Sequence, residues 1–232
     1  MGQRKHGAEH AEPFFGETGA RSERIFFGAL DTQSDRYKEL LVEAVKKQKE
    51  REAEEGRTVP KHWENVPPYL DDDLAFDLAR GYQVIVGGEN KVAIDPSEPD
   101  GNLQPFLSEV RIALLDELAF NDSRHEDEVN VYTAASYSTR EVDKTPADYH
   151  AGVDGFIDIP VAGLRDTYVT VTFDITLKEK DVVKADIVIG KLPDPRTEID
   201  AFLEEVDTIA ARVAALYRKR KGEALPRYRK YT

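Results

Sequence analysis

The stretch Tyr168-Val-Thr-Val-Thr-Phe-Asp-Ile-Thr-Leu-Lys178 has the most regular alternation of apolar and polar residues in this chain. Apolar residues occupy every second position, and the positions between them hold threonines, Asp174 and Lys178. Because successive side chains of a β-strand point to opposite faces, the pattern predicts a strand with one apolar and one polar face. An acid in mid-strand is unusual by propensity, so we expect the polar face to be half-buried or functional.

Other strands and helices are expected around this stretch. Three further segments have strand character, at 129–137, 155–159 and 184–189. An apolar helix is expected at 105–120, and a long amphipathic helix is expected after the turn at 194–195. The order of helix, four strands and helix predicts an α/β fold, with α+β as the alternative, in which helices flank a mixed central sheet.

The first hundred residues are less regular and predict an N-terminal extension at 1–101. It begins with an arm whose anchors are Phe14-Phe15 and Phe26-Phe27, followed by a charged helix at 35–55. A short helix is expected at 74–80, and a hairpin is expected at 82–94, turning at Gly87-Gly88-Glu89-Asn90. The expected core then covers 102–217, and a basic tail covers 218–232.

Composition limits the class of protein. The 232 residues contain no cysteine, so a metal would have to be held by oxygen or histidine ligands. There is neither an apolar run of about 20 residues nor the apolar core of a signal peptide, so we expect a soluble, cytoplasmic protein without membrane contact. A net charge of -13 argues against a surface that binds nucleic acid everywhere.

The C-terminal tail is basic, although the chain as a whole is acidic. Between its charges lie two tyrosines, an arrangement suited to a phosphate backbone of DNA or RNA or to an acidic protein partner. The competing interpretation is a solvated tail that only keeps the protein soluble. The basic residues are Arg218, Lys219, Arg220, Lys221, Arg227, Arg229 and Lys230.

Three acids come from three different expected elements: Glu109 from the first core helix, Asp154 near a strand start and Asp174 within a strand. Converging carboxylates repel unless a cation or proton lies between them, and oxygen ligands suit Mg²⁺ or Mn²⁺. Lys178 or Lys184 would then offset negative charge on a reacting phosphoryl group. His150 is expected to act as a ligand, a general base or a hydrogen-bonding support.

These residues resemble the motifs of the PD-(D/E)XK, or restriction-endonuclease-like, superfamily. The resemblance covers about residues 103–217 and consists of a helix with Glu109, the Gly152-Val-Asp154 segment, and Asp174 in the next strand. It implies Mg²⁺-dependent cleavage of phosphodiesters, with Asp154 and Asp174 as metal ligands. The family pattern has a lysine two residues after the second acid, where this chain has Thr176. Lys178 or Lys184 would have to replace it, or the protein would be an inactive copy.

Each of these residues also has a purely structural interpretation. Asp154 can form a turn with its own backbone, Asp174 can face solvent, and Glu109 can be a helix-surface acid. The chain has neither the Gly-x-Ser-x-Gly pattern of serine hydrolases nor the His-Glu-x-x-His pattern of zinc hydrolases. The alternative function is a non-catalytic interaction protein that docks on a larger assembly through its N-terminal arm and basic tail.

Overall fold

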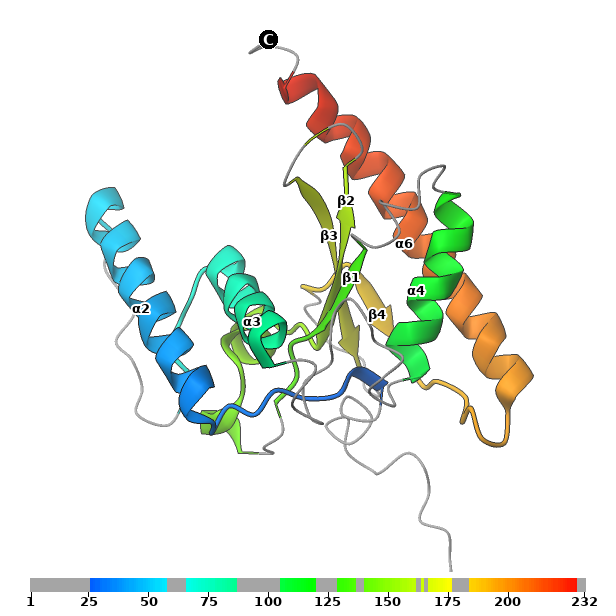
Figure 1. Ribbon diagram of the computed structural model, residues 1–232, viewed down its shortest axis with the longest axis horizontal. Coiled ribbons are helices and arrows are strands. Elements are labelled where there is room, and N and C mark those ends of the chain that lie inside the picture. The colour runs from blue at the N-terminus through cyan, green and yellow to red at the C-terminus, as the bar shows by residue number, and fades with distance from the viewer. Residues whose placement is uncertain are drawn as a thin grey trace, which may run out of the picture.

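The computed structural model (Figure 1) describes residues 26–57, 66–86, 105–119, 129–136, 140–161, 164, 167–176 and 184–228. The helices are α2 (Asp35–Glu55), α3 (Asp72–Val86), α4 (Pro105–Leu118) and α6 (Ile199–Tyr228), with the short turns η2 (Glu141–Asp143) and η3 (Ala147–Ala151). The strands are β1 (Asn130–Thr133), β2 (Gly155–Pro160), β3 (Tyr168–Ile175) and β4 (Ile187–Ile189).

The four strands form one mixed sheet in the order β1-β2-β3-β4. β1 pairs with β2 and β2 with β3 in antiparallel fashion, whereas β3 and β4 are parallel. The α/β class with a mixed sheet between helices is therefore confirmed. All four strands lie where the sequence predicts them, although β1, β3 and β4 are shorter than expected.

One face of the sheet is covered by α4 and α6, which also pack against each other (Figure 1). The apolar positions of β3 point to this face, as the alternation predicts, and meet Phe106, Val110 and Leu114 of α4. The Tyr217 hydroxyl of α6 donates to the Pro160 carbonyl at 2.9 Å. The buried stripe of α6 and the apolar face of β3 thus build the main core.

The other face of the sheet is covered by α3, against which α2 packs. Phe156 of β2 lies at its centre, stacked on Tyr132 with ring centroids 4.9 Å apart and against Phe76 at 5.0 Å. Arg80 of α3 crosses the same ring at 5.1 Å and binds Asp158. Both faces of β2 are therefore buried, so its polar residues lie inside the protein.

The N-terminal extension contributes directly to this packing. Phe26 and Phe27 are buried in the main core, and the Phe27 ring meets Phe106 edge-on with centroids 5.5 Å apart. Leu30 forms a bridge with Ser136, next to the end of β1. The expected anchoring by Phe26-Phe27 is confirmed, while Phe14-Phe15 lies outside the described residues.

The hairpin expected at 82–94 is wrong in its first arm, because α3 continues to Val86. Leu74, Leu78 and Tyr82 recur every four residues and are buried together, so helical packing outweighs the strand propensity of the apolar residues that follow. The expected turn at 87–90 lies outside the described residues. In the described part of the chain, no helix has the length and apolar character needed to cross a membrane.

Candidate functional site

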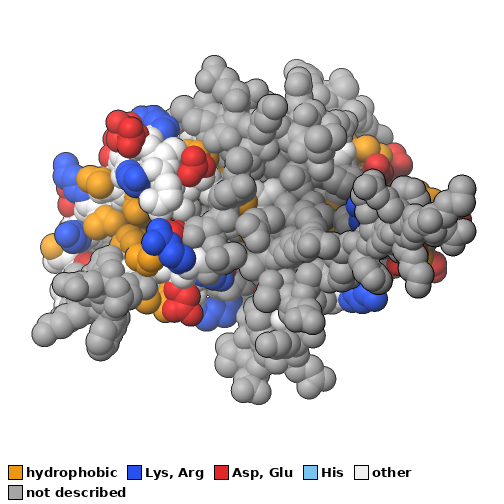
Figure 2. All heavy atoms as spheres, turned by 90° about the horizontal axis from the view of Figure 1, so that it is seen from below, with side chains coloured by type: hydrophobic (Ala, Val, Ile, Leu, Met, Phe, Trp, Pro, Cys, Tyr) orange, Lys and Arg blue, Asp and Glu red, His pale blue; other side chains and the backbone are white. Residues whose placement is uncertain are grey.

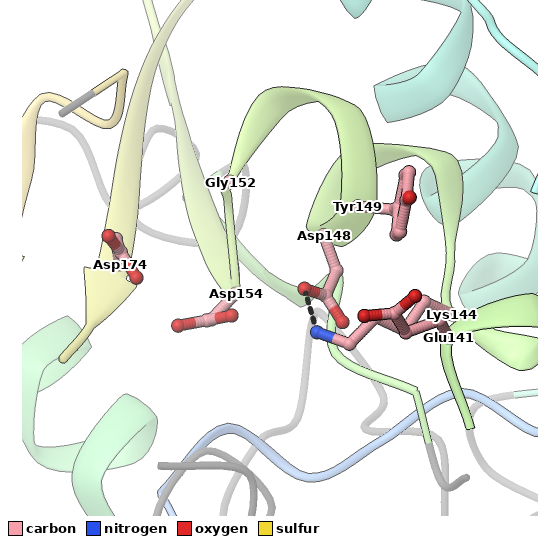
Figure 3. A pocket seen from close by; sticks show the side chains of 7 residues that line it. All are labelled: Glu141, Lys144, Asp148, Tyr149, Gly152, Asp154 and Asp174. Carbon is pink, nitrogen blue, oxygen red and sulfur yellow. Dashed lines mark hydrogen bonds and ion pairs between the residues drawn. The ribbon is translucent and has the colours of Figure 1, made fainter. Parts of the chain in front are cut away.

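A hollow of about 260 Å³ opens at the end of the sheet where β3 finishes and β2 begins (Figure 3). Asp154 and Asp174 both line it, so the structure brings together the two aspartates that the sequence singles out. The opposite side is formed by η2, η3 and the residues between them. The lining residues are Glu141, Lys144, Asp148, Tyr149, Gly152, Asp154 and Asp174.

Asp154 is only 3% exposed and is fixed by its own backbone and side chain. Its amide donates to the Phe173 carbonyl at 2.8 Å, and its Oδ2 accepts the Ile175 amide at 2.7 Å. The amides of Ala134 and Ala135 both donate to its carbonyl, a local irregularity of the kind by which β-bulges re-aim side chains. Asp154 lies one residue before β2, and its carboxylate accepts the Ile175 amide, which helps to orient it.

Asp174 lies within β3, on the face opposite the apolar residues, and is also 3% exposed. It stands opposite Val188 in the parallel pairing with β4. In Figure 3 its carboxylate and that of Asp154 lie next to each other on the same side of the hollow. The alternative interpretation, in which Asp174 faces solvent, is wrong, because this end of β3 is buried on both faces.

The segment that leads into Asp154 is a single π-helical turn, η3, which ends at Gly152 in the left-handed region with φ of 63°. Single π-helical turns are rare and are frequently found at functional sites. The hydroxyl of Thr145 accepts the Asp148 amide at 3.0 Å and stabilises the start of the turn. The Lys144 ammonium binds Asp148 Oδ1 at 2.9 Å. This ion pair connects the chain just before η3 to the turn itself.

The other predicted site residues lie elsewhere. Glu109 is half-buried on α4, and neither it nor Lys184 is among the described residues that line the hollow. Lys184 donates to the carbonyl of His150. His150 hydrogen-bonds the Pro67 carbonyl through Nε2 at 2.9 Å, so its observed contact is that of a hydrogen-bonding support. Lys178 lies outside the described residues.

The start of the basic tail is part of α6. Arg218 donates to the Glu117 carbonyl at 2.6 Å, and Lys221 lies 5.4 Å from the ring centroid of Tyr217. Lys219 is exposed. The side chain of Arg227 and the whole of Arg229 and Lys230 lie outside the described residues.

Arg220 connects α6 to the strands. It donates to both carboxylate oxygens of Asp186 and to the Thr170 carbonyl at 2.7 Å. Burial by itself would raise the pKa of Asp186, but the hydrogen bonds from Arg220 and Thr172 outweigh it and lower the pKa below its usual value. Asp186 also accepts the Thr172 amide at 3.0 Å, two residues from Asp174 on β3, but neither Asp186 nor Arg220 is among the described residues that line the hollow.

From the sequence, no role was assigned to Glu141, Lys144, Asp148 or Tyr149. The signals for the π-turn were present: Pro146 stands where a helical turn begins, and Gly152 stands where it ends. Lys144 and Asp148 also have the spacing of a helical ion pair. Five residues are too few for hydrophobic periodicity to reveal a turn.

Within the described residues, no three acidic or histidine side chains come together as a ready-made metal site. A scan against protein-family models, a search of curated proteins and a search of solved structures each find no match to this chain. The interpretation of the hollow therefore rests on the residues that line it.

Proposed function

We propose that this protein is a divergent member of the PD-(D/E)XK nuclease class that binds, and in its active form cleaves, nucleic-acid phosphodiesters at the hollow. One observation carries the proposal: Asp154 and Asp174 come from different segments, are both buried, and open onto one cavity. Carboxylates gathered in a poorly solvated space favour a bound cation or proton. Glu141 and Asp148 on the opposite side add to the negative charge.

The lining residues fit a magnesium ion. Mg²⁺ prefers oxygen ligands, keeps several waters, and is often held by one or two protein carboxylates together with substrate phosphates. Asp154 and Asp174 would supply those carboxylates, so a third protein ligand is not required. Once bound, the ion would polarise a phosphoryl oxygen and lower the pKa of a coordinated water.

The chain itself supplies rigidity at this site. The Asp154 carboxylate is oriented by the Ile175 amide, and Asp174 lies inside a paired strand. Groups that are held in place before the substrate binds lose little freedom when the reaction occurs. Thr176, at the position where the family has its lysine, donates its amide to the Ile189 carbonyl at 3.0 Å and extends the β3–β4 pairing.

A cleavage assay tests the proposal. Labelled single- and double-stranded DNA and RNA would be incubated with the protein in Mg²⁺, Mn²⁺ or EDTA. We expect metal-dependent cleavage that is lost in Asp154→Asn and Asp174→Asn but kept in Asp200→Asn, whose side chain is exposed on α6. Glu109→Gln should also keep activity, because Glu109 does not line the hollow. Cleavage that survives in both buried-aspartate variants would contradict the assignment.

One observation favours the alternative of an interaction protein. The exposed side of α2 carries a shallow groove lined by charged residues and by Val42, which is 69% exposed. The left-hand part of Figure 2, where α2 and its surroundings are seen from below, shows hydrophobic side chains among Lys, Arg and acidic ones. If the protein neither cleaves nor binds metal, and Val42→Asp abolishes capture of a partner, this second function would replace the first.

A further inference from the structure

Lys144 is the basic residue among the described side chains that line the hollow. It precedes the π-turn η3 and approaches the cavity from the side opposite Asp174 (Figure 3). We propose that Lys144 is the cationic residue that contacts the phosphate in this site, and that Asp148 holds it in position. The inference rests on the proposed function and adds a residue that the sequence did not single out.

The contact between Lys144 and Asp148 gives the ammonium a defined place. Its Nζ lies 2.9 Å from Asp148 Oδ1; the Lys144 side chain is 29% exposed, whereas that of Asp148 is 8% exposed. Asp148 is thus a buried anchor, and the lysine remains accessible from the cavity. In Figure 3 the ammonium lies at the end of Lys144 that faces the side of Asp154 and Asp174.

The anchor itself is rigid. The amide of Asp148 is bound by the Thr145 hydroxyl, and that hydroxyl donates in turn to the Ala134 carbonyl beside the end of β1. Ala134 also donates its amide to the Asp154 carbonyl at 2.8 Å. The lysine side and the aspartate side of the hollow are therefore joined through one short network of hydrogen bonds.

Phosphodiester hydrolysis requires positive charge beside the phosphoryl oxygens, and Lys144 would supply it in this hollow. A water oxygen bonds to phosphorus, the bond from phosphorus to one sugar oxygen breaks, and that oxygen is protonated while the second proton of the attacking water passes to solvent. Negative charge on the phosphoryl oxygens must be stabilised during this exchange. Lys144 would donate hydrogen bonds to those oxygens as a point charge.

The two lysines suggested by the sequence are the rivals. Lys184 donates to the His150 carbonyl and does not line the hollow, so its observed contact supports the chain at the end of η3. Lys178 lies outside the described residues, and the experiment must include it. A purely structural Lys144, which only ties η2 to η3 through Asp148, is the remaining alternative.

The test compares Lys144→Met, Lys144→Arg, Lys178→Met and Lys184→Met in the full chain, by Mn²⁺ titration calorimetry, cleavage assay and thermal unfolding. We expect Lys144→Met to reduce cleavage at least thirty-fold and to tighten Mn²⁺ binding about three-fold or more, because a positive charge that lines the same hollow as Asp154 and Asp174 is removed. Lys144→Arg should restore part of the cleavage. Lys184→Met should leave Mn²⁺ affinity unchanged and lower only the unfolding temperature.

The outcomes separate the two proposals. If the wild type binds Mn²⁺ and cleaves, but Lys144→Met binds and cleaves like the wild type while Lys178→Met is inactive, only the assignment of Lys144 is overturned. If the wild type binds Mn²⁺ without cleaving, an unchanged Mn²⁺ affinity in Lys144→Met overturns it. If the wild type neither binds Mn²⁺ nor cleaves, the proposed function fails and the role of Lys144 fails with it. If Lys144→Met and Asp148→Asn lose the same amount of stability and neither changes Mn²⁺ affinity, Lys144 and Asp148 form a purely structural pair and the proposal is overturned.

Discussion

Two pairs of carboxylates in the same sheet have opposite surroundings. Asp158 and Asp186 each bind an arginine through both carboxylate oxygens, Arg80 in the first case and Arg220 in the second. Asp154 and Asp174 instead line a common hollow, and Asp154 accepts a backbone amide. All four belong to, or lie directly beside, the strands β2, β3 and β4.

The difference shows what each pair contributes. Arg80 of α3 binds Asp158 of β2, and Arg220 of α6 binds Asp186 beside β4. Each ion pair therefore connects a helix to the sheet. Asp154 and Asp174 instead line a cavity at the end of the sheet. Buried charge is costly unless it is compensated, so carboxylates placed around a cavity point to a ligand, whereas those bound by arginine point to structure.

The largest expected effect is on activity at the hollow. Asp174→Asn preserves the shape of the side chain and removes its charge, so metal-dependent cleavage should fall by about a thousand-fold, comparable to losing one strong stabilising group in a transition state. The free energy of unfolding should stay the same or increase, because repulsion with Asp154 is relieved. Cleavage kinetics and urea unfolding of the same preparation check both expectations; retained cleavage would place the site elsewhere.

The second largest effect is expected on stability, at the ion pair between Arg80 and Asp158. Arg80→Ala leaves the carboxylate of Asp158, whose side chain is 6% exposed, buried without its arginine, and should lower the free energy of unfolding by about 3 kcal/mol. In the double variant Arg80→Ala with Asp158→Asn, part of this loss should be recovered, because no uncompensated charge remains. Urea unfolding measures both. A loss below about 0.5 kcal/mol in the single variant would mean that the pair is not structural.

A smaller effect is expected where the core meets the hollow. A Cβ added at Gly155 would lie 2.5 Å from Cδ1 of the buried Phe27 ring and 3.1 Å from the Tyr132 carbonyl. Gly155→Ala should therefore cost about 2 kcal/mol of stability through overpacking, and it should reduce cleavage because Asp154 is the adjacent residue. Gly190→Ala, where nothing lies within 4 Å of the added atom, is the matched control. Equal stability of the two variants would contradict this packing.

The smallest effect is the response of the Asp186–Arg220 pair to pH. Because the folded pKa of Asp186 is lowered, its stabilising contribution is present above the unfolded pKa and is lost as the pH falls through the folded pKa. The pair is partly exposed, so the contribution is no more than about 1 kcal/mol after solvent screening. The difference in unfolding free energy between wild type and Arg220→Ala should therefore shrink between pH 6 and pH 2. A difference independent of pH would rule out this linkage.

The sequence predicted the sheet well because its strands carry strong signals. The alternation in β3 identified both its apolar face and the unusual position of Asp174. The long stripe of α6 likewise identified the helix that covers one face. Periodicity failed at α3, because Tyr82-Gln-Val-Ile-Val fits a strand pattern equally well. In the fold, Tyr82 is buried together with Leu74 and Leu78 of the same helix.

At the candidate site, the convergence of Asp154 and Asp174 was predictable because both are close to strand ends that a sheet brings together. The proposed role of Lys144 was not predictable, because it depends on a five-residue π-turn and on a contact with Asp148. In the sequence, that contact is visible only as a four-residue spacing. In the basic tail, by contrast, the sequence suggested a binding role for a residue that the fold uses in a structural contact. Arg220 looked like a free cation in the sequence, but in the fold it binds Asp186.

Thermal unfolding in the presence and absence of Mn²⁺ tests the central claim, that the hollow lined by Asp154 and Asp174 holds a divalent cation. At a hundred-fold excess over Kd, a ligand bound only by the native state stabilises it by about 2.7 kcal/mol, or roughly 5 to 10 °C for a chain of this size. We predict such a rise for the wild type and none for Asp154→Asn or Asp174→Asn. No rise in the wild type, or an equal rise in all three proteins, would contradict the account.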